Sequence, residues 1–134
     1  MQPPAANATS LPEITSTSPQ VLVWAGSTSV GQWAIQLARA AGYHVITTAS
    51  PKNHGVLQKM GAAEVYDYRD ETVPDKISKE HPNLSAALDC VSENGTQSLC
   101  VRSLGSKGGR IAVLLKPDES AAGLRGDVKI IHTL

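Results

Sequence analysis

Residues 26–31 read Gly-Ser-Thr-Ser-Val-Gly, a loop of small residues between an apolar run and a helical pattern. The first N–H groups of a helix and the positive end of its dipole attract phosphate. In such a loop Gly26 would permit a tight turn, and Gly31 would permit close packing of the helix on the strand. Thr28 stands where the middle glycine usually lets the backbone approach a pyrophosphate.

Hydroxyl groups could offset the less close approach that Thr28 imposes, because they can donate hydrogen bonds to phosphate oxygens. Three neighbouring residues carry them: Ser27, Thr28 and Ser29. The loop therefore predicts a dinucleotide site whose pyrophosphate lies at the start of the helix, beside the hydroxyls of Ser27, Thr28 and Ser29. The alternative is an ordinary strand-to-helix turn with polar caps.

The turn after the second apolar run bears on which dinucleotide is bound. NAD sites usually place Asp or Glu about 20 residues past the loop, where it holds the ribose 2′-hydroxyl. No acidic residue occurs between Ile14 and Ala63, and residues 49–53 read Ala-Ser-Pro-Lys-Asn. A 2′-phosphate favours a lysine and hydroxyl donors. The sequence therefore favours NADP(H), held by Ser50 and Lys52; alternatively, Ser50 only caps the next helix and Lys52 is a solvated surface residue.

Apolar runs alternate with helical patterns from Pro19 onward. The expected strands are 21–24, 44–48, 64–68, 85–89, 109–115 and 128–131. The first expected helix follows the loop and carries an apolar stripe at 30, 33, 34, 37, 38 and 41. Further helices are expected over 52–60, 72–80 and 93–104. Ser92 is expected as the N-cap of the last helix, and a polar loop with Pro117 and Gly123 is expected before the last strand.

Strand–helix alternation with apolar strands predicts an α/β fold with a parallel sheet covered on both faces. The expected architecture is a Rossmann-type, doubly wound, six-stranded sheet of order 3-2-1-4-5-6. Residues 1–19 are rich in Pro, Ser and Thr and are expected to form a flexible lead or linker. Residues 20–134 are expected to form one domain.

Charge and composition exclude several classes of partner. The formal net charge is zero, which removes the electrostatic reason to bind nucleic acid or an anionic membrane. No run of about 18 apolar residues exists to span a bilayer. Cys90 and Cys100 match no zinc pattern and are expected as buried free thiols, in a reducing, cytoplasmic compartment. The four histidines show no paired ligand spacing, so no metal site is predicted.

Three segments resemble the cofactor domain of the medium-chain dehydrogenase/reductases. They are VLVWAGSTSVGQWAIQLARAAGYHVITTASPKN, LQKMGAAEVYDYRD and ALDCVSENGTQSLCVRSLGSKGGRIAVLL. The similarity is greatest to the zinc-independent branch: quinone oxidoreductases and fungal trans-acting enoyl reductases that partner polyketide synthases. It covers about residues 21–134.

The resemblance implies that the loop residues Gly26, Ser27, Thr28, Ser29 and Val30 carry the pyrophosphate, and it implies roles at five positions outside the loop. Ser50, Lys52 and Asn53 match a Ser-Pro-x-Asn turn that holds the 2′-phosphate of NADPH. Tyr68 matches a tyrosine that packs beside the adenine ribose, although from sequence alone it would more often be structural. Leu114 matches a backbone position near the nicotinamide.

The chain also departs from the family. Whole members are more than twice as long, and their first half supplies much of the substrate cleft and, in zinc-dependent relatives, the metal ligands. We therefore expect an excised or truncated cofactor domain of an NADPH-dependent reductase of activated C=C bonds, inactive alone. No catalytic residue is assigned, because Asp89 could act as a base but is more simply the anchor of a turn.

Other functions stay open at this stage. The same fold could serve as a non-catalytic module that binds a nucleotide or a protein, or as a homodimer joined at the sixth strand, although enoyl reductases of this branch tend to be monomers. A short-chain reductase is set aside, because no tyrosine is followed four residues later by lysine. Trp24 and Trp33 are expected in packing, with Trp33 as a candidate contact to the missing half.

Overall fold

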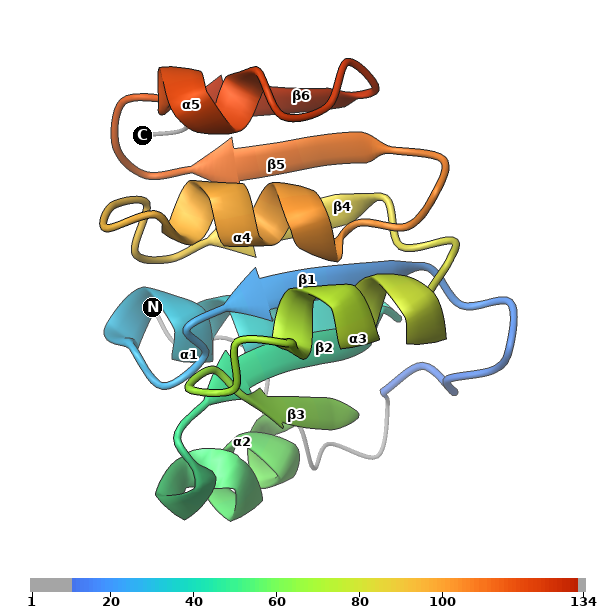
Figure 1. The fold of residues 1–134 in the computed structure, drawn as a ribbon. Coiled ribbons are helices and arrows are strands. Elements are labelled where there is room, and N and C mark those ends of the chain that lie inside the picture. The colour runs from blue at the N-terminus through green and yellow to red at the C-terminus, as the bar shows by residue number, and fades with distance from the viewer. Residues whose placement is uncertain (1–10, 133–134) are drawn as a thin grey trace.

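The computed structural model describes residues 11–132 and contains one parallel sheet of order β3-β2-β1-β4-β5-β6 (Figure 1). Its strands are β1 (Gln20–Trp24), β2 (His44–Ala49), β3 (Glu64–Asp67), β4 (Ala86–Asp89), β5 (Gly109–Val113) and β6 (Val128–His132). This confirms the predicted Rossmann-type fold. Residues 11–19 form no helix or strand, and the first ten residues of the expected lead lie outside the described residues.

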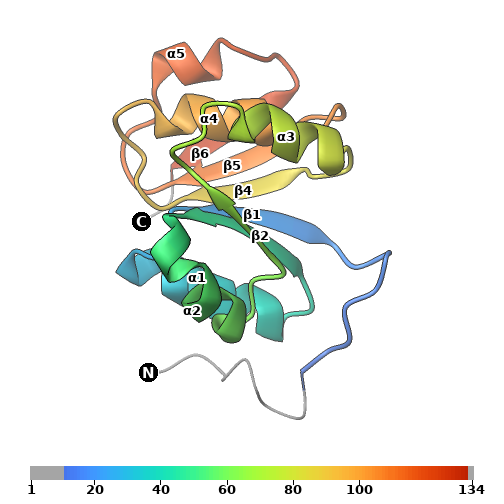
Figure 2. The same cartoon turned by 60° about the horizontal axis from the view of Figure 1, so that its bottom comes forward.

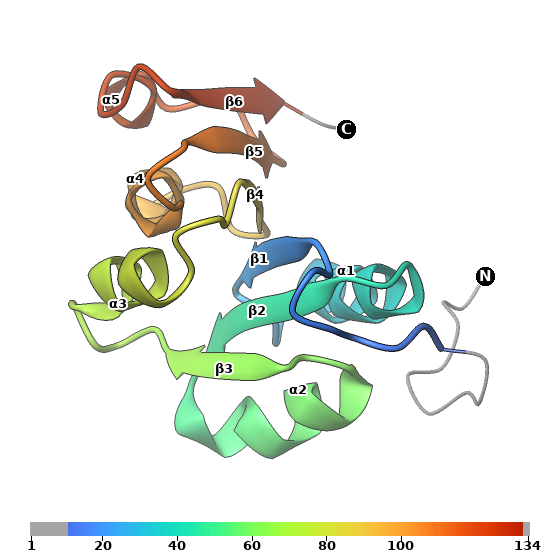
Figure 3. The ribbon, with the colours of Figure 1, turned by 90° about the vertical axis from the view of Figure 1, so that its right-hand side faces the viewer.

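Helices cover both faces of the sheet (Figures 2 and 3). One face carries α1 (Ser29–Ala40) and α2 (His54–Met60), and the other carries α3 (Val73–Glu80), α4 (Thr96–Ser103) and α5 (Glu119–Ala122). The strand order reverses between β1 and β4, where α/β folds open a crevice at the carboxyl edge of the sheet.

Successive side chains of β1 point to opposite faces and so join two separate cores. Val23 packs with Ile35 of α1 and Leu57 of α2 on one side of the sheet. Leu22 packs with Ile77 of α3, on the other side. The last three residues of β1 are therefore buried whichever way they point, and all three are apolar.

The apolar stripe of α1 is only partly buried. Gly31 and Ile35 face the sheet, whereas Val30, Trp33 and Leu37 remain 43%, 40% and 49% exposed. Trp24, by contrast, lies in the core at 4% exposure. The described chain thus presents an uncovered apolar strip along α1.

Two expectations for the second half were wrong. Helix α4 begins at Thr96 with Gly95 as its N-cap, so Ser92 does not cap it. Bonds from the backbone to Asp89 hold the chain in a turn at that point, with positive φ at Ser92, Asn94 and Gly95. The expected polar loop contains the short helix α5, which is capped by the Asp118 side chain accepting from the Ser120 N–H.

Among residues 11–132, no helix combines the length and the apolar character needed to cross a bilayer.

Both cysteines are free thiols, as predicted, with Cys100 fully buried and Cys90 partly buried. Burial, reinforced by the negative charge of Asp89, raises the pKa of the Cys90 thiol to about 12, although a hydrogen bond with Thr28 opposes the shift. The same two causes raise the pKa of Cys100 well above its ordinary value. The thiolate is the reactive form, so both cysteines should be inert in the folded chain.

We expect both thiols to resist a thiol-specific reagent at pH 8 and to react rapidly once the chain is unfolded in denaturant. The shift at Cys90 alone leaves about a thousandfold less thiolate than an ordinary cysteine has. Because the raised pKa favours the protonated folded state, the thiol contribution to stability should hold below about pH 9 and decline above it. Fast labelling of either thiol in the folded chain at pH 8 would contradict this.

Candidate cofactor site

A cavity of about 310 Å³ opens at the carboxyl edge of the sheet, beside the paired ends of β1 and β4 where the strand order reverses. Its lining comes from residues at or just beyond the ends of four strands and from the start of α4: Trp24, Ala25, Ser27, Thr48, Ala49, Tyr68, Val91 and Thr96. Of the predicted cofactor residues, Ser27 and Tyr68 line this cavity directly. The others lie on the loops outside its lining.

Strand β2 holds the β1–α1 turn from beneath. The Ala25 N–H donates to Thr48 Oγ1 at 2.9 Å, and the Gly26 N–H donates to the Thr48 carbonyl at 3.0 Å. The left-handed residue of this turn is Ala25, with φ of 68°. The prediction that Gly26 permits the tight turn therefore gave the wrong reason for this glycine. The residue with positive φ in the turn is Ala25, directly before it.

Gly26 and Gly31 are required by crowding. A Cβ on Gly26 would lie 2.2 Å from Thr47 Oγ1, and one on Gly31 would lie 2.4 Å from the Ala25 carbonyl oxygen. Real Cβ atoms do not approach other atoms so closely, so the two glycines let α1 pack against the end of β1. This confirms the packing role that the sequence assigned to Gly31.

Thr28 is the N-cap of α1. Its Oγ1 accepts from the Gly31 N–H at 3.0 Å and donates its one proton to the Ala25 carbonyl at 2.9 Å. Thr28 has φ of −70°, so this position needs no glycine. The hydroxyl is committed to the cap, which leaves Ser27 and Ser29 as the loop hydroxyls available to a ligand.

The first turn of α1 still offers two backbone donors. Gln32 donates to the Thr28 carbonyl and Gly31 to the Thr28 side chain. Within residues 11–132, the N–H groups of Ser29 and Val30 have no hydrogen-bond partner. Two free N–H groups at the start of a 12-residue helix suit an anionic ligand.

The turn after β2 is a short 3₁₀ segment over Pro51–Asn53, with Lys52 exposed. Ser50 sits at its N-cap position but makes no capping hydrogen bond through its side chain. Instead Ser50 Oγ accepts from Asn53 Nδ2 at 3.3 Å. Ser50, Lys52 and Asn53 therefore lie on one small turn, with the Ser50 hydroxyl proton free to reach a ligand.

One carboxylate lies beside this turn in the structure although it is distant from the turn in the sequence. Asp67 ends β3 directly beside Ala49 in the parallel register. Both Asp67 oxygens accept from the Arg69 guanidinium at 3.0 Å. These bonds from Arg69 hold the pKa of Asp67 below its ordinary value and offset its charge locally. The carboxylate of Asp67 beside this turn is therefore paired with the Arg69 cation and is not free.

Tyr68 projects from the end of β3 with 52% exposure. It lines both the first cavity and a second one of about 370 Å³, which it shares with Trp24. Arg102 and Pro74 also line the second cavity. An exposed ring between two cavities can stack against a planar ligand group.

Leu114, the predicted nicotinamide neighbour, is held on both sides of its peptide group. Its N–H donates to Ser92 Oγ at 2.8 Å, and its carbonyl lies 3.3 Å from His132 Nε2. The same Ser92 hydroxyl donates to the Asp89 carbonyl at 2.8 Å. The backbone after β5 is thereby fixed to the turn after β4.

Asp89 is a structural anchor, as its simpler interpretation predicted. The residue is fully buried, and its Oδ1 accepts from the N–H groups of Val91 and Ser92 at 3.0 and 2.8 Å. Its Oδ2 accepts from the Thr96 hydroxyl at 2.7 Å. With these bonds filled by its own turn, the carboxylate is not placed to act as a base.

The family model that matches this chain is described as "Zinc-binding dehydrogenase" and covers residues 29–122. The chain belongs to this family. Members of its enoyl reductase branch bind NAD(P)H. The family's description does not by itself place zinc in this chain.

Similar curated proteins are fungal trans-enoyl reductases. One from Macrophomina phaseolina is 43% identical over 115 residues, which cover 85% of this chain and 32% of that protein. One from Chaetomium globosum is 41% identical over 128 residues, which cover 95% of this chain and 34% of that protein. The chain therefore spans about a third of the length of these relatives.

Solved structures with the same fold include two enoyl reductases and a quinone oxidoreductase. CurK enoyl reductase superposes with a TM-score of 0.73 at 26% identity, covering 96% of this chain and 38% of that one. JamJ enoyl reductase gives 0.72 at 24% identity, with coverages of 87% and 36%. The Pseudomonas syringae quinone oxidoreductase gives 0.72 at 20%, with coverages of 89% and 40%.

The crowding at Gly31 generates a stability prediction with a matched control. Gly31→Ala should destabilise the chain by about 1–3 kcal/mol, because the new methyl meets backbone atoms of residues 25 and 26 that cannot give way. Gly55→Ala, in α2, has nothing within 4 Å and should stabilise by about 0.5–1 kcal/mol. Urea unfolding of both variants measures this. Equal effects of the two substitutions would contradict the packing role of Gly31.

Proposed function

We propose that this chain is the NADP(H)-binding domain of an oxidoreductase that reduces an activated C=C bond, of the enoyl or quinone type. Residues 20–134 form the cofactor domain, and residues 1–19 act as a lead or linker to it. When bound, NADPH supplies the hydride that such a reduction requires. The protein residues contribute binding and orientation of the cofactor.

The observation that carries the choice of NADP(H) is the turn after β2. It offers an exposed lysine, a serine hydroxyl free to donate and an amide, and its neighbouring acid, Asp67, is paired with Arg69. A 2′-phosphate would gain charge-assisted hydrogen bonds from Lys52 and Ser50. A bare 2′-hydroxyl of NAD(H) would find no free carboxylate to accept its proton.

The β1–α1 loop suits the pyrophosphate. The free N–H groups of Ser29 and Val30 and the hydroxyls of Ser27 and Ser29 would donate to it, while Thr28 and Gly26 fix the loop from behind. Tyr68 would pack beside the adenine ribose. Leu114, held by Ser92, would stand near the nicotinamide.

Reduction itself would need a substrate-binding half elsewhere in a longer protein. The chain spans about a third of its curated relatives, and no acid–base pair is assigned among the described residues of the cofactor site. The exposed strip on α1, at Val30, Trp33 and Leu37, suits contact with such a half. We expect the chain alone to bind NADPH and to turn over little or no substrate.

Partners of the whole protein follow from the same proposal. As in the trans-acting branch, the full protein would serve a polyketide synthase. Within residues 11–132 the β6 strand pairs with β5 alone, and its other edge would be the one that joins a second copy. Light scattering separates a monomer from that dimer. A chain that binds no dinucleotide but holds a protein partner would favour the alternative, a non-catalytic module.

Calorimetric titration with NADPH and NADH tests the cofactor assignment. Ser50→Asp combined with Lys52→Ala should weaken NADPH binding about 10- to 100-fold and NADH binding much less, because only NADPH loses charge-assisted hydrogen bonds and gains repulsion.

Lys59→Ala is the matched control, because it removes an exposed lysine from the last turn of α2, away from the phosphate turn. It should leave both affinities unchanged. Equal losses for the two dinucleotides in the double variant would show that the turn is merely structural. Equal or undetectable binding of both dinucleotides by the unmodified chain would overturn the cofactor assignment.

A further inference from the structure

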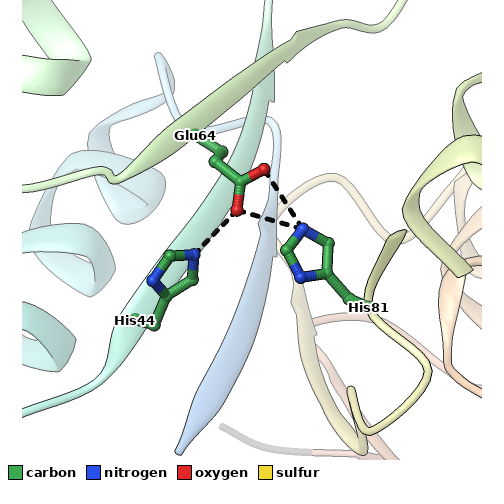
Figure 4. Close-up of side chains that lie close together, drawn as sticks. All are labelled: His44, Glu64 and His81. Atoms are coloured by element: carbon green, nitrogen blue, oxygen red, sulfur yellow. Dashed lines mark hydrogen bonds and ion pairs between the residues drawn. The ribbon is translucent and has the colours of Figure 1, made fainter. Parts of the chain in front are cut away.

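Three side chains with metal-binding chemistry meet at the amino edge of the sheet, opposite the cofactor cleft (Figure 4). His44 begins β2, Glu64 begins β3, and His81 follows the last residue of α3. Their ligand atoms all lie within 4.8 Å of one another. The chain separates these residues by 20 and 17 positions, and the parallel sheet brings them together.

The two imidazoles converge on one carboxylate. His44 Nε2 lies 2.7 Å from Glu64 Oε2, and His81 Nε2 lies 3.0 Å from the same oxygen and 3.2 Å from Oε1. A tetrahedral ion with bonds of about 2.0–2.1 Å holds its ligand atoms roughly 3.3 Å apart. The two histidine–carboxylate separations are therefore already close to those of a coordination shell, and the third pair, the two imidazole nitrogens, lies within 4.8 Å.

We propose that His44, Glu64 and His81 form a binding site for a divalent transition-metal ion of the zinc class. Two imidazoles and one carboxylate suit borderline ions such as Zn²⁺, whereas Mg²⁺ and Ca²⁺ favour oxygen ligands throughout. The proposal rests on these residues and not on the family's description.

Surrounding groups would orient the ligands, as metal sites require. Gln20 Nε2 lies 3.2 Å from His81 Nδ1, and Gln20 Oε1 is buried without a hydrogen-bond partner among the described residues. A metal on His81 Nε2 leaves the imidazole proton on Nδ1, which then needs an acceptor. A half-turn of the Gln20 amide brings that unpartnered oxygen to it. The single proton of the Tyr66 hydroxyl is shared between Glu80, the nearer acceptor, and Glu64 Oε1 at 3.3 Å, so Tyr66 links the two carboxylates.

The cluster opens to a cavity of about 660 Å³, which gives an ion an entry route and room for a water as fourth ligand. Glu80 lines the same cavity and adds negative charge. A bound ion would join the starts of β2 and β3 to the end of α3, which His81 links to Glu64 at 3.0 Å. The ion would therefore stabilise the fold without touching the cofactor.

Titration of the full chain with Zn²⁺ alone, after treatment with a chelator, tests the site. We expect one ion per chain and a melting temperature that rises with free Zn²⁺. His44→Gln and His81→Gln should each weaken binding at least tenfold. The double variant His54→Gln, His132→Gln removes the other two histidines and should bind Zn²⁺ like the parent. Equal affinity in all variants, or no stoichiometric binding by the parent, would overturn the proposal.

Substitution of Co²⁺ for Zn²⁺ keeps the test decisive if a histidine variant fails to fold. The unmodified chain should give the visible absorption of a nitrogen- and oxygen-ligated ion, without the charge-transfer band that thiolate ligands add. A thiolate band would place the ion on Cys90 or Cys100 and contradict the proposal. Gln20→Met keeps all three ligands and should weaken binding about tenfold through the lost contact to His81.

Discussion

The close approach of α1 to the end of β1 is the constraint on which the cofactor site depends. Gly26 lies against Thr47 and Gly31 against the Ala25 carbonyl, with no space for a methyl group at either. Thr48 holds the turn from the neighbouring strand through its side chain and its carbonyl. This contact places the free N–H groups of α1 at the carboxyl edge of the sheet, where the strand order reverses between β1 and β4. A shift of the helix would move those donors, the Ser27 hydroxyl and the cavity wall together.

The parallel sheet places the proposed cofactor site and the proposed metal site at opposite ends of its strands. All strands end at one edge, so Trp24, Ala49 and Asp67 become neighbours there although the chain separates them widely. All strands begin at the opposite edge, which brings His44 beside Glu64. The whole length of the sheet lies between the edges, so a ligand at one need not displace a ligand at the other. The proposed metal site and the proposed NADP(H) site can therefore be tested independently.

Features set by local sequence could be predicted, and features set by contacts across the sheet could not. Alternating apolar runs and helical patterns predicted six strands in the correct order, because the central strands β1 and β2 are buried on both faces and a helix links each strand to the next. The role of Gly31 followed from its place in the loop. The meeting of His44, Glu64 and His81 was missed because metal-site patterns look for ligands at short, regular spacings. The pairing of Asp67 with the turn after β2 was missed for the same reason, since it depends on strand register.

Some errors came from local signals that a tertiary contact overrides. Ser92 resembles an N-cap, but buried Asp89 accepts from its N–H and keeps residues 92–95 in a turn, so α4 begins at Thr96. The apolar stripe of α1 has the periodicity of a core face, yet the buried residues of the helix are Gly31 and Ile35, and of the stripe itself Ala34 and Ala38 pack against the core. The remaining apolar residues stay exposed, a pattern expected where a helix packs on a second body.

Thr28 shows how a departure from a familiar pattern can keep its function. The three-glycine loop uses its middle glycine to let the backbone approach phosphate, and a β-branched residue there makes that approach less close. At φ of −70°, however, Thr28 adopts a conformation open to any residue, and its hydroxyl takes over the N–H of Gly31 as a helix cap. The cap fixes the start of α1 and leaves the Ser29 and Val30 donors free. The backbone of this loop approaches phosphate less closely, but the Thr28 cap makes the loop more rigid. An anion site at a helix start requires free donors that are held rigidly.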